Sequence, residues 1–174
     1  MDRFRIRAFG PADEAPATQL LDAYLGGRRQ VRLGEMHDVL ALPGFVAEDG
    51  DRIVGVATYA LEGRRAELAV LLVTGEHRRL GVASSLISAV VTAVVDLGGD
   101  ELWLVTTNDN LDALRFYQRR DFRLHELRPG AVDRSRKVKP EIPLVGQHAI
   151  PLRDELVLVR PLREPLSAGP RTEA

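Results

Sequence analysis

The sequence predicts a mixed α+β fold in three layers (α/β/α), with a mostly antiparallel sheet between helices. Residues 44–73 contain three apolar runs separated by short turns with glycine, the pattern of consecutive antiparallel strands. Residues 81–97 and 110–120 instead repeat their apolar side chains at the spacing of a helix. The strand–helix–strand order of residues 101–127 implies a local parallel pair joined by a right-handed crossover. The sheet is therefore expected to be mixed.

Length and composition indicate one soluble domain, expected over residues 1–162. A chain of 174 residues can bury roughly 70% of its unfolded surface, so one core is enough. The formal net charge of −1 gives no general attraction to nucleic acid or to membranes. The sequence has no cysteine, which excludes disulfides, thiolate metal sites and a cysteine nucleophile. Because no apolar leader or membrane-length stretch is found, we expect a cytoplasmic protein.

The first elements are predicted from local patterns. Arginine and apolar side chains alternate over residues 3–8, as in a strand with one buried face. Residues 10–27 fit a helix that begins near Pro11 and ends at two glycines. Its predicted buried face consists of Leu20, Leu21, Tyr24 and Leu25. We expect a second, shorter helix over residues 31–42.

The three strands that follow are predicted at residues 44–48, 52–61 and 66–73. Asp49 and Gly50 separate the first two strands, and this pair of residues favours a tight hairpin turn. Gly63, with two arginines after it, separates the second and third strands. These three strands are therefore expected to be antiparallel neighbours in sequence order.

From Gly81 the apolar side chains recur with the period of a helix, and Gly98 and Gly99 end the pattern. The predicted buried stripe consists of Val82, Leu86, Ala89, Val90, Ala93, Val94 and Leu97. Later elements are predicted as a strand at 101–107, a helix at 110–120, and strands at 122–127 and 155–162. Between the last two strands, residues 128–154 are expected to form an ordered loop that could hold one helical turn. Residues 163–174 are expected to form a flexible tail.

The start of the helix at Gly81 carries positive charge without an acidic residue to balance it. A helix N-terminus leaves backbone N–H groups unpaired, so an acidic side chain or a bound anion is often found there. Here Arg78 and Arg79 precede the turn, and the nearest acid on the helix side is Asp96 at the far end. Small side chains leave room for a bulky anion at Gly81, Ala83, Ser84 and Ser85. Two interpretations stay open: a pyrophosphate site, or a turn with solvated arginines.

The spacing of residues in this segment distinguishes between nucleotide-binding motifs. Neither the P-loop nor the three-glycine dinucleotide motif is present, so a kinase or a dehydrogenase does not fit. RRLGVA at residues 78–83 does fit the pattern Arg/Gln-x-x-Gly-x-Gly/Ala, between a predicted strand and a predicted helix. With this motif the sequence resembles the GCN5-related N-acetyltransferase (GNAT) family. In that family the backbone amides of the segment hold the pyrophosphate of acetyl-CoA.

A second segment carries the same resemblance. Asn110, Ala113, Tyr117 and Phe122 match the family's pattern near coenzyme A, although Asp121 stands where the family often has glycine. That position often ends the helix with a positive φ, which aspartate tolerates less well than glycine. The resemblance covers about residues 3–127. It implies the acyl-CoA N-acyltransferase (GNAT) fold, with a splayed parallel strand pair, and acetyl-CoA as cosubstrate without a metal.

The resemblance also implies which residues bind the cofactor. The pantetheine arm is expected along the strand before residue 74, where a backbone amide would meet the thioester oxygen. The implied cofactor-binding residues are Leu71, Leu72, Val73, Arg78, Arg79, Leu80, Gly81, Val82, Ala83, Ser84 and Asn110. Asn108 and Asn110 are both candidate helix N-caps. In relatives the second asparagine contacts coenzyme A, so Asn108 is expected nearer the acceptor.

Two side chains are candidates for the chemistry. By its resemblance to family members that acetylate lysine, Glu67 is the expected general base, because an amine is mostly protonated at neutral pH. The alternative is an exposed glutamate paired with Arg64 or Arg65. Tyr117 is the implied acid for the departing thiolate. Its alternative role is to pack the helix on the sheet, together with Ala113 and Phe116.

The leading hypothesis is an N-acetyltransferase in which a small-molecule or peptide amine attacks the thioester directly. The alternatives are a catalytically silent acyl-CoA sensor and a purely structural domain. Basic and aromatic residues do not interleave, so we expect no nucleic acid partner. The four histidines show no metal-ligand spacing and are expected at the surface. The cations of residues 134–139 could attract an acidic acceptor or the 3'-phosphate of coenzyme A, or be solvated. Edge strands could mediate a homodimer.

Overall fold

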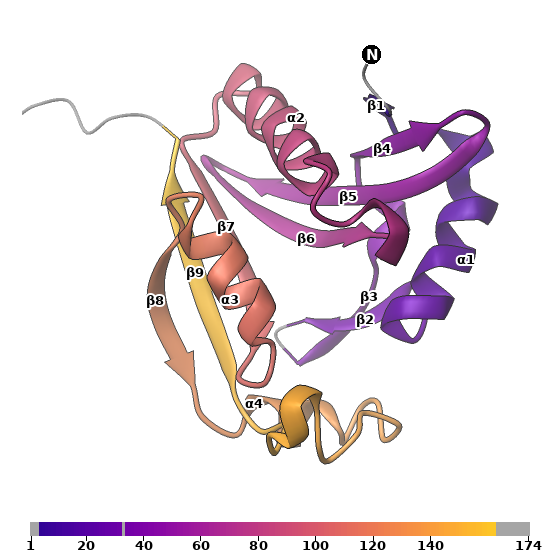
Figure 1. Ribbon diagram of the computed structural model, residues 1–174. Coiled ribbons are helices and arrows are strands. Elements are labelled where there is room, and N and C mark those ends of the chain that lie inside the picture. The colour runs from indigo at the N-terminus through magenta and orange to yellow at the C-terminus, as the bar shows by residue number, and fades with distance from the viewer. Residues whose placement is uncertain (1–3, 33, 163–174) are drawn as a thin grey trace, which may run out of the picture.

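The computed structural model describes residues 4–32 and 34–162, so the expected tail at 163–174 lies outside the described residues. Within them, seven strands form one sheet in the order β1-β4-β5-β6-β7-β9-β8 (Figure 1). These strands are β1 (Arg5–Ala8), β4 (Gly44–Asp49), β5 (Arg52–Glu62), β6 (Arg65–Val73), β7 (Glu101–Thr107), β8 (Arg123–Arg128) and β9 (Glu155–Pro161). The helices are α1 (Glu14–Leu25), α2 (Val82–Asp96), α3 (Leu111–Gln118) and α4 (Ala131–Ser135). The 3-10 turns are η1 (Pro11–Asp13), η2 (Val39–Ala41), η3 (Gly75–His77) and η4 (Gln147–Ala149).

The sheet confirms the predicted mixed fold. β4, β5 and β6 are consecutive antiparallel neighbours, and Gly50 adopts a φ of +58° in the first hairpin turn. β6 and β7 form the parallel pair, and α2 connects them. The parallel pair predicted for the strand–helix–strand unit β7–α3–β8 is wrong, because β9 lies between β7 and β8 and is antiparallel to both (Figure 1).

Apolar side chains from the helices cover both faces of the sheet. On one face α2 buries Val82, Leu86, Ile87, Val90 and Val94. On the other face α1 packs Ala17 and Leu21 against strands of the same sheet. Three residues predicted to be buried are exposed instead, by 46% at Tyr24, 43% at Leu25 and 63% at Leu97. Tyr24 and Leu25 lie in the last turn of α1, beyond its contact with the sheet, and Leu97 follows the last residue of α2.

The helix predicted over residues 31–42 is wrong. This part of the chain forms the antiparallel hairpin β2 (Arg29–Arg32) and β3 (Glu35–Asp38), followed by η2. Gly34, in the turn, has a φ of +84°, a conformation that glycine adopts without steric cost and that a helix does not contain. Asp38 then accepts a hydrogen bond from the N–H of Leu40 at 3.1 Å, which starts the 3-10 turn instead of a helix.

The segment between β8 and β9 is ordered and contains the short helix α4, as expected for residues 128–154. Two of its cationic side chains, those of Arg136 and Lys139, bind backbone carbonyls instead of solvent or an acidic ligand. Arg136 donates to the carbonyl of Ile142 at 3.0 Å and to that of Leu152 at 2.6 Å. Lys139 is 9% exposed, and its Nζ donates to the carbonyl of Gly26 after α1 at 3.2 Å and to that of Arg29 in β2 at 3.1 Å. These residues hold the segment against itself and against the N-terminal half of the chain.

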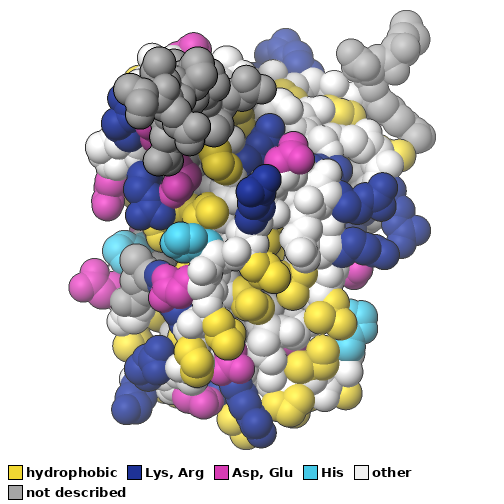
Figure 2. Space-filling view, turned by 90° about the vertical axis from the view of Figure 1, so that its left-hand side faces the viewer, with side chains coloured by type: hydrophobic (Ala, Val, Ile, Leu, Met, Phe, Trp, Pro, Cys, Tyr) yellow, Lys and Arg dark blue, Asp and Glu magenta, His cyan; other side chains and the backbone are white. Residues whose placement is uncertain are grey.

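The two edges of the sheet are β1 and β8. Figure 2 looks onto the β8 side of the molecule, and apolar side chains gather on the lower half of this face. The exposed apolar side chains of β8 and of the segment after it are Leu124, Leu127, Val138, Leu144 and Val145. The dimer expected through an edge strand stays a prediction. Within the described ranges, no helix is both long and apolar enough to cross a membrane.

Candidate active site

The parallel strands β6 and β7 separate shortly after they begin. Their ladder joins only residues 65–67 of β6 to residues 101–103 of β7, although both strands continue further (Figure 1). Beyond this point β6 also contains a β-bulge: Leu68 pairs with Tyr59 and Val70 with Thr58, so Ala69 has no partner on β5. A bulge bends its strand and increases the local twist. Leu71, Leu72 and Val73 therefore lie in the part of β6 that β7 does not pair with.

The segment of residues 78–83 contains the end of the loop between β6 and α2 and the first two residues of α2. Gly81 is the N-cap residue of α2, with a φ of +89°, and a Cβ added there would meet no atom within 4 Å. The first turn of α2 has neither a side-chain cap nor an acidic residue. Arg78, Arg79 and Leu80 are exposed beside it. The predicted anion site therefore has the expected local geometry: N-terminal amides without a side-chain cap, an open approach and two neighbouring cations.

A third cation near the start of α2 comes from the turn after α3, and the sequence analysis did not predict it. Arg120 donates to the hydroxyl of Ser84 from Nη2 at 2.7 Å and from Nε at 3.1 Å. Its guanidinium carbon lies 3.7 Å from the ring centroid of Phe116, four residues earlier. Burial lowers the pKa of Arg120, and the charge of Arg119 contributes to the same shift. The i, i+4 spacing to Phe116 is the sequence signal that predicts the stacking, but not the contact with α2.

One histidine predicted to lie at the surface is instead part of the structure that supports residues 78–83. The side chain of His77 is 11% exposed and lies in η3, directly before this segment. Its Nδ1 lies 2.9 Å from the hydroxyl of Thr74, and its Nε2 lies 2.9 Å from a carboxylate oxygen of Asp49. Asp49 is the last residue of β4, so this contact joins the β4–β5 turn to the loop that precedes the predicted anion site.

Glu67 is buried on β6 at the last pair of the β6–β7 ladder, and its residue exposure is 6%. The alternative role, an exposed glutamate paired with a neighbouring arginine, is wrong. Arg64 pairs with Asp100 at 2.7 Å, and Arg65 pairs with Glu101 at 2.6 Å. The carboxylate of Glu67 is therefore held at the point where β6 and β7 diverge, and its role as a base stays a prediction.

Tyr117 packs on α3 between two aromatic rings. Its ring centroid lies 5.2 Å from that of Phe116 and 5.4 Å from that of Phe122, in edge-to-face arrangements. Burial raises the pKa of the phenol, so the group keeps its proton at neutral pH. Asp121 ends this region with a φ of +65°, the left-handed conformation expected at the family's glycine. The packing role of Tyr117 is thus present, and its role as an acid stays a prediction.

The two asparagines after β7 have different structural partners. Asn110 caps α3, because its Oδ1 accepts from the N–H of Ala113 at 3.1 Å. Asn108 donates to the carbonyl of Pro151 at 2.9 Å and accepts from the N–H groups of residues 153 and 154 at 3.0 Å. Asn108 therefore holds the chain that enters β9. The contacts predicted for these asparagines with coenzyme A and with the acceptor remain predictions.

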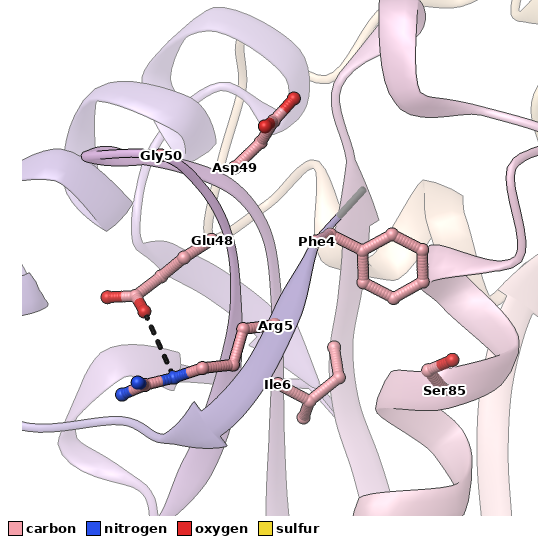
Figure 3. A pocket seen from close by; sticks show the side chains of 7 residues that line it. All are labelled: Phe4, Arg5, Ile6, Glu48, Asp49, Gly50 and Ser85. Atoms are coloured by element: carbon pink, nitrogen blue, oxygen red, sulfur yellow. Dashed lines mark ion pairs between the residues drawn. The ribbon is translucent and has the colours of Figure 1, made fainter. Parts of the chain in front are cut away.

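A surface hollow of about 770 Å³ lies beside the first turns of α2, away from the divergence of β6 and β7. It is lined by Phe4, Arg5, Ile6, Glu48, Asp49, Gly50 and Ser85 (Figure 3). In Figure 3, Arg5 and Glu48 lie on one side of the hollow and form an ion pair at 3.7 Å, and Phe4 and Ser85 lie on the other side. The hollow contains neither Glu67 nor Tyr117, so it is separate from the predicted chemistry.

The model of the GNAT acetyltransferase family matches residues 15–122 of this chain. The chain belongs to the GNAT acetyltransferase family. The uncharacterized protein YxbD of Bacillus subtilis is 41% identical over 123 residues, which cover 70% of this chain and 76% of YxbD.

Solved structures of other GNAT proteins share the fold. The IAA acetyltransferase from Bacillus cereus has a TM-score of 0.73 at 19% identity and covers 91% of this chain and 99% of its own. A GNAT family acetyltransferase from Elizabethkingia anophelis with acetyl-CoA bound has a TM-score of 0.66 at 17% identity. The match covers 92% of this chain and 99% of that protein's chain. At these identities the likeness concerns the fold, and it extends over β8 and β9, beyond the family match.

Proposed function

We propose that this GNAT protein is an acetyl-CoA-dependent N-acetyltransferase that transfers the acetyl group to a small-molecule or peptide amine. The observation that carries the proposal is the start of α2. Gly81 begins a helix without a side-chain cap, and a short loop with η3 connects this helix to β6, the strand that diverges from β7. The bound acetyl-CoA of the Elizabethkingia anophelis relative supports the same cofactor for this chain.

The residues at the start of α2 fit the diphosphate of a coenzyme. Backbone N–H groups of residues 81–84 would bind the diphosphate oxygens, because the helix dipole favours negative charge there. Arg78 and Arg79 add exposed positive charge, and Arg120 fixes the hydroxyl of Ser84. At Leu71, Leu72 and Val73, the edge of β6 that faces β7 has no strand partner. The backbone groups on this edge would bind the pantetheine arm. Acetyl-CoA would supply an activated acetyl group at the divergence of the two strands.

The side chains at this point suit a direct transfer. Glu67 would accept the proton that the acceptor amine loses as its nitrogen bonds to the acetyl carbon. The phenol of Tyr117 is protonated at neutral pH. It would donate its own proton to the sulfur of coenzyme A as the carbon–sulfur bond breaks. The chain has no cysteine, so the acetyl group cannot pass through a thioester on the enzyme. Direct attack by the amine is the mechanism that these residues support.

Two measurements on the purified protein test the proposal. Acetyl-CoA at about 100 times its dissociation constant should stabilise the fold by roughly 2.7 kcal/mol, which a thermal melt detects. Thiol release from acetyl-CoA should then be measured with a panel of amines, amino-terminal peptides and aminoglycosides. Stabilisation without thiol release from any acceptor would indicate an acyl-CoA sensor instead of an enzyme. If acetyl-CoA does not stabilise the protein at all, the proposed cofactor site is wrong.

A further inference from the structure

A second buried carboxylate, that of Glu155, lies on the same face of the sheet as Glu67. Glu155 begins β9, opposite Thr107 at the end of β7 and Arg128 at the end of β8. Paired residues of neighbouring strands project to the same face, and alternate residues of one strand do so as well. Thr107 and Trp103 share a face of β7, and Trp103 pairs with Glu67. This face is opposite α2, because Leu102 and Leu104, between those residues, pack into the core with α2.

The two carboxylates occupy opposite ends of the divergence between β6 and β7. Glu67 lies at the last pair of the ladder, whereas Glu155 lies beside the C-terminal end of β7. The four residues from Trp103 to Thr107 correspond to about 13 Å along the strand. An extended molecule whose amine reaches Glu67 would therefore place its other end near Glu155.

Glu155 has no partner that would explain its burial. It is 9% exposed, yet none of the side chains and backbone groups that the structure describes forms a hydrogen bond or ion pair with its carboxylate. The nearby Arg128 instead forms two hydrogen bonds with Glu126, at 2.9 and 3.1 Å. Burial raises the pKa of Glu155, and the charge of Glu67 adds to this shift against the opposing effects of Arg128 and Arg134. Burying a carboxylate without a partner costs free energy, so a ligand cation would be stabilising here.

The carboxylate of Glu155 is still within reach of a ligand. In the described chain, the hydroxyl of Thr58 is the buried side-chain polar atom that is both fully enclosed and unpaired. The carboxylate oxygens of Glu155 also lack a hydrogen-bond partner in the described residues, but they are not fully enclosed. They are therefore in contact with the solvent. Since the attacking nitrogen must lose its proton before the transfer, it cannot neutralise Glu155 during the reaction. A second nitrogen that stays protonated can do so.

We propose that Glu155 binds a second ammonium group of the acceptor, so that the preferred substrates are small extended amines with two cationic nitrogens. The inference rests on the proposed acetyl transfer for the choice of an amine as ligand. The geometry also predicts a length dependence, because the two ammonium groups must span the distance between Glu67 and Glu155. Long diamines should bind more tightly than short ones.

Binding of diamines and monoamines tests this inference separately from catalysis. Dissociation constants are measured by titration calorimetry for 1,4-diaminobutane, 1,6-diaminohexane and 1,8-diaminooctane, each against the monoamine of equal chain length. Coenzyme A is present, which has no acetyl group to transfer. A charged hydrogen bond predicts about 10- to 100-fold tighter binding of the longest diamine than of its monoamine. In Glu155→Gln this ratio should fall to about one, whereas Glu62→Gln, the same charge change at an exposed residue of β5, should keep it.

The outcomes separate this inference from the proposed function. If the wild-type protein does not distinguish diamines from monoamines, or if Glu155→Gln keeps the preference, Glu155 is not the cation site. Glu155→Asp offers a second check, because its shorter side chain should move the optimum to a longer diamine. Thiol release by the wild-type protein with the same amines decides the proposed transfer. Failure there would leave the binding result, and thus the assignment of Glu155, intact.

Discussion

Replacement of Gly81 separates the backbone geometry of the anion site from its charge. Gly81 has a φ of +89°, and a Cβ at this position would contact nothing within 4 Å. The cost of Gly81→Ala is therefore the left-handed backbone alone, roughly 1–2 kcal/mol. For a chain of this size, each 1 kcal/mol corresponds to about 2–4 °C in melting temperature. We expect Gly81→Ala to melt about 2–8 °C lower, with coenzyme A binding largely retained.

Gly81→Glu should show the same strain and also abolish binding of coenzyme A. Like charges about 5 Å apart interact unfavourably by roughly 3 kcal/mol at an effective dielectric constant near 20. A carboxylate at the mouth of α2 should therefore weaken coenzyme A by more than about 100-fold. The assay is titration calorimetry with coenzyme A, together with thermal melts with and without the ligand.

Gly75→Glu provides the matched control for charge. Gly75 lies in η3, where an added Cβ also meets nothing within 4 Å and φ is not left-handed. This variant adds the same charge in the same loop without the strain, and it should bind coenzyme A far more tightly than Gly81→Glu. If Gly81→Glu instead binds coenzyme A within about tenfold of the wild type, the diphosphate does not bind at the start of α2.

Three further variants test other parts of the site. Tyr117→Phe should lower kcat by about 10- to 100-fold while the dissociation constant of coenzyme A changes little, and an unchanged kcat in steady-state thiol release would exclude the acid role. Arg120→Ala should weaken the binding of coenzyme A and lower the melting temperature, because it removes the link between the turn after α3 and Ser84. Unaltered affinity for coenzyme A in titration calorimetry would refute this. Burial raises the pKa of Glu155 in the folded protein above its unfolded value of about 4.3. Ionisation of Glu155 therefore lowers the free energy of unfolding. This loss begins above the unfolded pKa and grows as pH rises towards the folded pKa. Urea denaturation should therefore find Glu155→Gln more stable than the wild type at pH 8 and equal to it below pH of about 4, and a pH-independent difference would contradict this.

Features that depend on neighbouring residues were predictable from the sequence. The Asp49-Gly50 turn joins β4 to β5 because glycine adopts the positive φ that such turns need. The helical period after Gly81 predicted α2, and the absence of acid in its first turn predicted the open N-terminus. The family resemblance rested on the same local segment, residues 78–83. Each of these features is determined by interactions over a few residues, so the printed sequence contains the relevant information.

Features that depend on contacts between distant segments required the tertiary structure. Residues 29–38 form a hairpin and not a helix, because strand pairing and the conformation of Gly34 outweigh helix propensity there. The insertion of β9 between β7 and β8 places Glu155 beside the end of β7, and no local pattern indicates that position. The contact of Arg120 with Ser84 spans 36 residues.

The sequence by itself therefore determined the strands and helices after residue 43, the open N-terminus of α2 and the family. Only the tertiary structure decided which charged side chains are paired and which are buried. Lys139 donates to carbonyls more than a hundred residues away, whereas Glu155 is buried without a hydrogen-bond or ion-pair partner in the part of the chain that the structure describes. Burial and pairing are properties of the space around a side chain, and that space is formed by segments that the linear sequence does not bring together.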